Sequence, residues 1–364
     1  MSQIVSRIWK PVRRRGAERY LQLTVLSFAA SVSLTRLILD LTGYPQLGNG
    51  TLHIAHVLYG GTILYASSLL PLLYANRWAY TWGAILSGVG VGLFIDEVGK
   101  FITQSNDYFF PAAAPIIYSV FLLTVLLYVR IKKEPEPDIR GEMYTVLEIL
   151  QEVLDHSIEP AEHDELKQRL DSIILKTENQ NYKRLAVELE DFVDSDALNP
   201  IEEEANFFDR IIDVWGKLEE KYLTETRFRV ILIGAFALLG LPNFMRFMGF
   251  AMVAFNPVQR IAFLENIVAS FPVASNNIVV WAMMLVVLDG FAGAFLSFGS
   301  ILLLIERRNW STQFASVSLI MSLVAINLVL FYVEQFQTII VAIAQYATLQ
   351  AVYYYQRKYV ITHQ

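Results

Sequence analysis

Residues 276–305 read NNIVVWAMMLVVLDGFAGAFLSFGSILLLI, and Asp289 is the one charged residue among them. A helix of about 20 predominantly apolar residues is long enough to cross the hydrocarbon core of a bilayer. The stretch therefore predicts a membrane-spanning helix, and it places a carboxylate near the middle of that helix.

The whole chain has the composition of a membrane protein. Of its 364 residues, 54% are hydrophobic and 18% are charged, whereas soluble domains carry about 25% charge. The absence of cysteine excludes disulfides, thiolate chemistry and iron–sulfur ligation. The basic start resembles a signal peptide, but the apolar run 20–41 is long enough to span and no small-residue cleavage site closes it. We expect an uncleaved first helix.

Eight segments have the length and apolar character of spans, and a long acidic stretch separates the first four from the last four. Residues 134–225 contain 26 acidic and 9 basic residues and no spanning run. The sequence therefore predicts an all-α polytopic protein with a four-helix half at 1–131, an inserted cytoplasmic helical domain at 132–225 and a second four-helix half at 226–364. The predicted spans are 18–43, 51–75, 78–105, 109–131, 227–255, 276–305, 312–333 and 335–357.

Lysine and arginine in the short loops predict the orientation. Eight alternating spans place every basic cluster on one face of the membrane. In the loops on the other face, Arg260 is the only lysine or arginine. Because cytoplasmic loops carry the excess of positive charge, we expect both termini in the cytoplasm. The clusters on that face are Arg13–Arg15 with Arg19, Arg77, Arg130 with Lys132 and Lys133, Arg227 with Arg229, Arg307 with Arg308, and Arg357 with Lys358.

The acidic stretch has helical periodicity, with Met143, Val146 and Leu150 on one face. Pro160 and the Asn199-Pro200 pair are typical of helix starts. The pattern predicts a small helical bundle, which leaves open a role as a regulatory module that binds a cytoplasmic protein. Its net charge of −17 excludes nucleic acid as a probable class of partner.

Ionisable residues concentrate at one depth of the first three spans. Such groups are costly in hydrocarbon, so they are usually paired or functional. With about 1.5 Å of rise per residue, all lie in the outer part of their helices, where we expect an ion- or substrate-binding site. The candidates are Arg36, Asp40, His53, His56, Asp96, Glu97 and Lys100, with Asp107 in the following loop.

Local spacing offers a structural interpretation of the same residues. Arg36 with Asp40, and Asp96 with Lys100, stand four residues apart and share a helix face, so each pair could be self-neutralising. Glycines at 60, 61, 88 and 92 allow helices two and three to approach closely. That approach would bring the histidines near the two carboxylates.

His53, His56, Asp96 and Glu97 are candidate ligands for a divalent metal ion, since imidazole and carboxylate bind such ions. The same groups could form a proton relay, because histidine titrates near neutral pH. Two histidines three residues apart are a weak zinc signal, and the chain has no HExxH motif. The sequence leaves the cofactor unknown.

The second half is less charged. Asp289 has no partner nearby in the sequence, although Arg246, which follows the helix-breaking Gly240-Leu241-Pro242, could reach toward it. Asn327, Glu334 and Gln345 mark the last two spans. The segment 256–275 is typical of an interfacial amphipathic helix or a re-entrant turn.

One block resembles a recurring block in uncharacterised bacterial membrane proteins. It comprises HIAHVLYGG at 53–61, GVGVGLFIDEVGKFIT at 88–103 and NDYF at 106–109. The resemblance covers roughly residues 50–120 and implies a protein of the bacterial cytoplasmic membrane. It implies no activity, because none is established for that group.

Three functions fit these residues. The first is a transporter or channel for a cation or small polar solute, with its site in the outer part of the first three spans. The second is a membrane-embedded enzyme that acts on a lipid or lipid-linked substrate, although the chain has no complete catalytic motif and a non-enzyme is favoured. The third is a sensor or scaffold whose acidic domain binds a partner. Membrane lipids are partners in each case, and the sequence leaves a homo-oligomer open.

Overall fold

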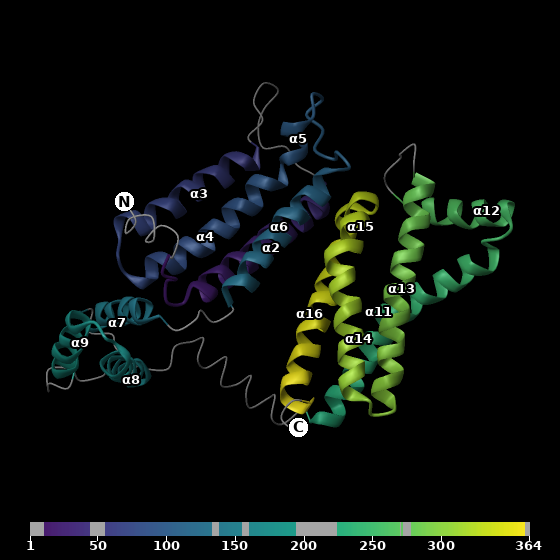
Figure 1. The fold of residues 1–364 in the computed structure, drawn as a ribbon. Coiled ribbons are helices and arrows are strands. Elements are labelled where there is room, and N and C mark those ends of the chain that lie inside the picture. The colour runs from purple at the N-terminus through teal and green to yellow at the C-terminus, as the bar shows by residue number, and fades with distance from the viewer. Residues whose placement is uncertain are drawn as a thin grey trace. The chain divides into compact units, whose positions relative to one another are not determined.

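The computed structural model describes residues 11–43, 55–132, 138–154, 160–193, 224–269, 271 and 278–360. Within these ranges the regular structure is helical and no strand occurs (Figure 1). This agrees with the predicted all-α class.

Seven helices are long and apolar enough to cross a membrane, which makes the chain a multi-pass membrane protein by helix length and hydropathy. They are α2 (Ala17–Thr42), α3 (His56–Leu73), α4 (Arg77–Asp96), α6 (Ala113–Lys132), α11 (Glu225–Val253), α13 (Ile278–Leu304) and the continuous stretch Arg308–Val333. That last stretch contains α14 (Arg308–Met321), the π-helix η1 (Ser322–Ile326) and α15 (Asn327–Val333).

The eighth predicted span, 335–357, is not among the seven helices that meet the length and hydropathy criterion within the described residues. The segment 335–357 forms a 3-10 turn η2 (Gln335–Thr338), α16 (Ile339–Tyr355) and a π-helical turn η3 (Gln356–Val360). With 17 residues, α16 rises roughly 26 Å, which is less than the ~30 Å hydrocarbon core. The third predicted span, 78–105, is also divided: α4 ends at Asp96, and the short α5 (Val98–Ile102) follows Glu97.

Glycines set the packing of α3 on α4 and of α4 on α2. A Cβ atom on Gly60 would lie 2.9 Å from the Gly90 carbonyl oxygen, and one on Gly92 would lie 2.7 Å from Ser31 Oγ. The predicted close approach of the second and third spans is confirmed at Gly60, whereas Gly92 packs on the first span and Gly61 has no atom within 4 Å of its Cβ position.

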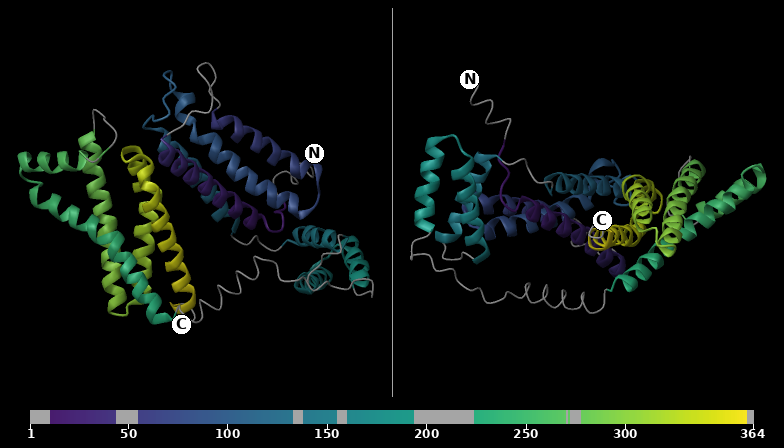
Figure 2. Two further views of the ribbon diagram at one scale, coloured as in Figure 1. Left: turned by 180° about the vertical axis from the view of Figure 1, so that it is seen from behind. Right: turned by 60° about the horizontal axis from the view of Figure 1, so that its bottom comes forward.

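The helices α7 (Ile139–Leu154), α8 (Pro160–Lys176) and α9 (Gln180–Val193) have an apolar core of their own. Val146, Ile149, Leu166 and Leu170 are completely buried in it. The two views of Figure 2 both keep these three helices together. The predicted start at Pro160 is confirmed, and the start expected at 199–200 lies outside the described residues.

In the C-terminal part, α11 packs along α13, α13 on α14, and α14 on α16 (Figure 1). Part of the segment 256–275 forms α12 (Pro257–Val268), whose N-terminus is capped by the Asn256 side chain. Leu264 is buried against α11 and α13, while Val258 is 77% exposed and Phe255, just before the helix, 97% exposed. This partition of apolar groups is typical of a helix at a membrane interface.

The chain forms two compact units. One comprises Met1–Leu26, Tyr65–Gly88 and Val125–Val214; the other comprises Ser27–Leu64, Val89–Thr124 and Trp215–Gln364. Each of α2, α3 and α4 contributes to both units. The division at 1–131, 132–225 and 226–364 stays a prediction.

Candidate functional site

A close helix contact in the second unit lies between α11 and α13, where two glycines face each other. A Cβ atom on Gly293 would lie 2.6 Å from the Gly240 carbonyl oxygen, and one on Gly240 would lie 3.0 Å from the Gly293 carbonyl oxygen. Only residues without side chains allow backbones to approach so closely. This contact fixes the register in which Asn243 faces Asp289.

Asp289 is held by an amide rather than by a cation. Asn243 Nδ2 donates a hydrogen bond to Asp289 Oδ1 at 2.9 Å. The ion pairs recorded among the described residues do not include Asp289. Asp289 is the twelfth residue of α13, so it lies roughly 16 Å from the Ile278 end, about halfway across a ~30 Å core.

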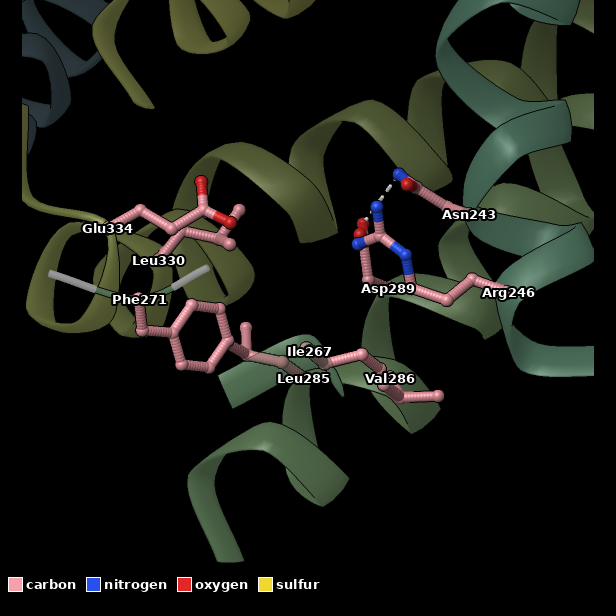
Figure 3. Close-up of a pocket in the computed structure, with 9 residues that line it drawn as sticks. All are labelled: Asn243, Arg246, Ile267, Phe271, Leu285, Val286, Asp289, Leu330 and Glu334. Atoms are coloured by element: carbon pink, nitrogen blue, oxygen red, sulfur yellow. Dashed lines mark hydrogen bonds between the residues drawn. The ribbon is translucent and has the colours of Figure 1, made fainter. Parts of the chain in front are cut away.

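A cavity of about 20 Å³ opens on one side of this hydrogen bond. Asp289, Arg246 and Glu334 are its charged lining residues, and Ile267 of α12 and Phe271 supply part of its apolar wall. In Figure 3, Asn243, Arg246 and Asp289 gather on one side of the cavity and Glu334 lies on the other. One cation thus faces two carboxylates, which gives the wall a formal charge of −1 when all three are ionised.

A second cavity of about 10 Å³ also uses Asn243 and Asp289 in its wall. Its other polar lining residues are Ser318, Ser322 and Gln345, none of which carries a charge. Ser322 begins the π-helix η1, and π-helical turns inside α-helices occur often at functional sites. The Asn243–Asp289 pair therefore stands between a charged cavity and a neutral polar one.

Gln345 is fixed by a buried network. Its Oε1 accepts a hydrogen bond from Asn327 Nδ2 at 2.8 Å, and Asn327 Nδ2 also lies 3.5 Å from Tyr118 Oη. Tyr118 donates to the Leu323 carbonyl oxygen at 2.5 Å, within the π-helix. Buried polar groups held this way have one defined geometry, so Gln345 has a fixed position in the wall of the second cavity.

The charged residues of the first three spans also come together, but in pairs that differ from the expected ones. Arg36 Nε donates to Asp96 Oδ1 at 2.6 Å and Arg36 Nη2 to the Asp96 carbonyl oxygen at 3.0 Å. Tyr108 Oη donates to Asp96 Oδ2 at 2.6 Å. The guanidinium also lies 3.7 Å from the centre of the Phe336 ring. Both oxygens of the Asp96 carboxylate are thus satisfied.

Glu97 forms a separate group. Its Oε1 accepts hydrogen bonds from the His56 backbone N–H at 3.1 Å and from Lys100 Nζ at 3.0 Å, and His56 Nδ1 lies 3.1 Å away. Glu97 is completely buried, and its Oε2 has no hydrogen-bond partner among the described residues.

The expected pairs Arg36–Asp40 and Asp96–Lys100 are therefore replaced by Arg36–Asp96 and Lys100–Glu97. Asp40 is exposed. Asp107 accepts a hydrogen bond from the Phe109 N–H at 2.9 Å, a local turn contact. His53 lies outside the described residues. Within the part of the chain that the structure describes, no three His, Asp or Glu side chains form a group that could hold a metal ion.

Several residues of these sites are absent from the predicted set. Tyr108 and Phe336 enclose Arg36, and Asn243, Ser318, Ser322 and Gln345 line the cavities beside Asp289. Asn243 could have been included, because a polar residue directly after Pro242 is unusual in an apolar helix. No sequence signal pairs Phe336 with Arg36.

A third cluster joins arginines of the first unit to carboxylates of α7 and α8. Arg15 reaches Glu162 at 2.9 Å and Glu165 at 2.8 Å, and its backbone N–H donates to Glu148 Oε2 at 2.9 Å. Arg77 also binds Glu162, at 2.8 Å. Burial alone would raise the pKa of Glu165, but hydrogen bonds and charge from Arg169 and Arg15 outweigh it, so that pKa lies below its ordinary value.

Comparison of the chain with family models, with curated proteins and with solved structures finds no match. The resemblance of the 53–109 block to uncharacterised bacterial membrane proteins therefore stays an expectation from its residues alone.

Proposed function

We propose that the chain is a membrane transporter or channel for a small cation, and that Asp289 is its central ion-binding group. The observation that carries the proposal is the setting of Asp289: a carboxylate halfway along an apolar helix, bonded to a neutral amide and bordered by two polar cavities. A carboxylate at that depth is costly unless it serves an ion pathway or a paired contact.

The size of the cavities favours a small ion over a larger solute. At about 20 and 10 Å³, each has room for about one water molecule, since roughly 10–15 Å³ holds one. A lipid headgroup or sugar does not fit there in this conformation. The proposal therefore prefers an ion to the lipid-linked substrate of an enzyme.

The expected site in the first three spans becomes a second candidate. Asp96 is satisfied by Arg36 and Tyr108, which is the arrangement of a structural ion pair. Glu97 Oε2 remains available to a ligand, with His56 and Lys100 beside it. We propose that this cluster holds the helix ends together and that Asp289 binds the transported ion.

We further propose the placement in the membrane that the loop charges indicate. The basic clusters and the acidic helices α7–α9 face the cytoplasm of a bacterial cell, and both termini lie there. For the C-terminus to return to that face, the continuous helical stretch of η2, α16 and η3 must form the eighth crossing. The arginine-bound carboxylates of α7 and α8 agree with a location beside the basic face.

The proposal is tested by ion flux into proteoliposomes. Wild-type protein and the Asp289→Asn variant are reconstituted at equal density, and uptake of H⁺, Na⁺ and Rb⁺ is measured under an imposed membrane potential. Uptake of at least one ion should exceed that of protein-free vesicles and should fall to their level in Asp289→Asn. The control is Asp40→Asn, an exposed carboxylate of α2. Equal uptake in wild type and Asp289→Asn would reject the proposal.

One observation favours a second function, that of a sensor or scaffold. The network from Arg15 and Arg77 to Glu148, Glu162 and Glu165 joins the acidic helices to the start of α4 and to the segment before α2. A protein that binds α7–α9 could transmit its binding through these contacts. Pull-down with the full chain and with a Glu148→Gln/Glu162→Gln variant, followed by flux assay with the captured partner, distinguishes regulation of transport from a purely scaffolding role.

A further inference from the structure

A stripe of polar and small residues continues from Asp289 along one face of α13. Asp289, Gly293, Ser297 and Ser300 follow one another at spacings of four, four and three residues, so they share one face of the helix. Gly293 and Ser297 lie against Gly240 of α11, and Ser300 Oγ donates to the Ile233 carbonyl oxygen of α11 at 3.2 Å. The stripe therefore lies in the α11–α13 interface.

Ser297 is the unusual member of this stripe. It is only 8% exposed, and its Oγ has no hydrogen-bond partner within the described ranges. A buried hydroxyl without a partner is uncommon, because its desolvation costs free energy that no bond returns. It points toward Gly240, beside the second cavity, whose wall includes Gly293 and Leu296. Ser297 is not among the residues that line the cavity, so its hydroxyl lies in the helix contact next to it.

The far end of the stripe approaches a charged pair that water can reach. Ile233 stands one helical turn from Arg229, whose Nη1 lies 2.8 Å from Glu306 Oε1. The Glu306 side chain is 65% exposed. From the larger cavity to this pair, the polar groups thus run in sequence from Glu334 and Arg246, through Asp289, to the hydroxyls of Ser297 and Ser300.

We infer that the conducted cation is the proton, relayed by Asp289 from the larger cavity to the smaller cavity and the serine stripe. The inference rests on the proposed function and names its ion. The two cavities share Asn243 and Asp289 as lining residues, and each has room for about one water molecule. A metal ion with its hydration shell does not fit in either cavity. A proton needs only a chain of hydrogen bonds.

The transfer balances in atoms and charge. Asp289 Oδ1 is engaged by Asn243, so Oδ2 accepts the proton from a hydronium ion in the larger cavity, which becomes water while the carboxylate becomes neutral. Oδ2 then releases the proton to a water molecule in the smaller cavity, which becomes a hydronium ion and passes the excess proton on, while the carboxylate regains its charge. Arg246 of α11 and Glu334, which follows α15, are the other charged groups of the wall, and they set the electrostatic potential on the entry side.

The experiment measures H⁺, Na⁺ and Rb⁺ flux in the same proteoliposomes under the same imposed membrane potential, with an internal pH dye. We expect H⁺ flux without Na⁺ or Rb⁺ flux, slower in D₂O than in H₂O. Asp289→Asn should reduce H⁺ flux by ~100-fold, as for other positioned proton-transfer groups. Asp289→Glu keeps a titratable group and should retain part of the flux, which separates loss of the proton carrier from misfolding.

Two serines provide a matched pair. Ser297→Ala removes the unpartnered hydroxyl of the stripe and should slow H⁺ flux. Ser316→Ala removes another unpartnered buried hydroxyl, which lies on α14 outside the stripe, and should leave the flux unchanged. Equal fluxes for these two variants would overturn the role of the stripe.

The possible failures are distinguishable. Na⁺ or Rb⁺ flux that depends on Asp289, without H⁺ flux, overturns the proton inference and leaves the proposed function standing. No flux of any ion above that of empty vesicles rejects the proposed function itself.

Discussion

At the scale of single residues, Asp96 and Asp289 are carboxylates of apolar helices with opposite surroundings. Asp96 is bonded to a cation and a phenol, whereas Asp289 is bonded to an amide beside open space. A carboxylate with every oxygen satisfied by fixed partners contributes to folding, and one beside a cavity can exchange its ion. This contrast is the reason why we propose a structural role for Asp96 and the ion-binding role for Asp289.

The first prediction tests this contrast at Asp96. Arg36→Met leaves the Asp96 charge buried without its cation, and removing one partner of a buried pair costs about 3–5 kcal/mol. We expect a marked loss of stability, measured by thermal unfolding in detergent. Arg36→Met combined with Asp96→Asn removes both charges and should recover much of the loss, while Asp40→Asn should change little. If Arg36→Met unfolded at the same temperature as the wild type, the structural role of the pair would be contradicted.

At the scale of elements, glycines decide which side chains meet. Gly240 and Gly293 bring α11 onto α13 and so place Asn243 at Asp289. Gly60, Gly90 and Gly92 bring α3 and α2 onto α4, where Arg36 meets Asp96.

The sequence predicts the long apolar helices well, because their length and composition are local properties. The sequence did not predict that the third span ends at Asp96 or that α16 has only 17 residues. A helix that ends inside a long apolar run has no sharp boundary in the local sequence. The partners of Arg36 and Lys100 could not be predicted from the sequence, because Asp40 and Asp96 stand four residues away and form equally good local pairs. Which carboxylate each cation meets depends on how the helices are aligned with one another. Asp289 and Arg246 were recognisable from the sequence, and the four-residue repeat through Gly293 and Ser297 was a signal that could have been used.

The second prediction concerns the glycine contact. Gly293→Ala places a Cβ 2.6 Å from the Gly240 carbonyl oxygen, so α11 and α13 must separate. We expect a loss of about 1–3 kcal/mol of stability, the usual cost of overpacking, together with reduced ion flux. Gly234→Ala on α11 is the control, because its Cβ position has no atom within 4 Å. That variant should be neutral or stabilising by up to ~1 kcal/mol, given the helix propensity of alanine. Equal behaviour of the two variants would contradict the packing account.

At the scale of the molecule, a network of ion pairs joins the acidic helices α7 and α8 to the basic segment before α2. Glu162 is shared by Arg15 and Arg77, and Arg169 bridges Glu165 and Glu142. These groups are partly exposed, so salt and pH should control the contact.

The third prediction gives the sign of that control. The pKa of Glu165 lies below its ordinary value of 4.5. The stability that its ion pairs give to the contact is therefore fully present above pH 4.5, and it is lost as the pH falls through the lower pKa of the folded protein. The backbone amide of Arg15, which donates to Glu148, reports the contact by hydrogen exchange. Its protection should decrease at acid pH, beyond the intrinsic pH dependence of exchange, and in 1 M salt, where the Debye length is ~3 Å. Glu148→Gln should weaken it at neutral pH. Protection that is insensitive to salt and to Glu148→Gln would contradict the contact.

The account depends most on the exchange of a proton at Asp289. Infrared difference spectra of the reconstituted protein, recorded as the pH is stepped up and down, detect the carbonyl stretch of a protonated carboxylic acid directly. The account predicts a reversible band in wild type and in Asp40→Asn that is missing in Asp289→Asn. A spectrum of Asp289→Asn that retains every carboxyl band of the wild type would show that Asp289 does not exchange a proton, and would contradict the account.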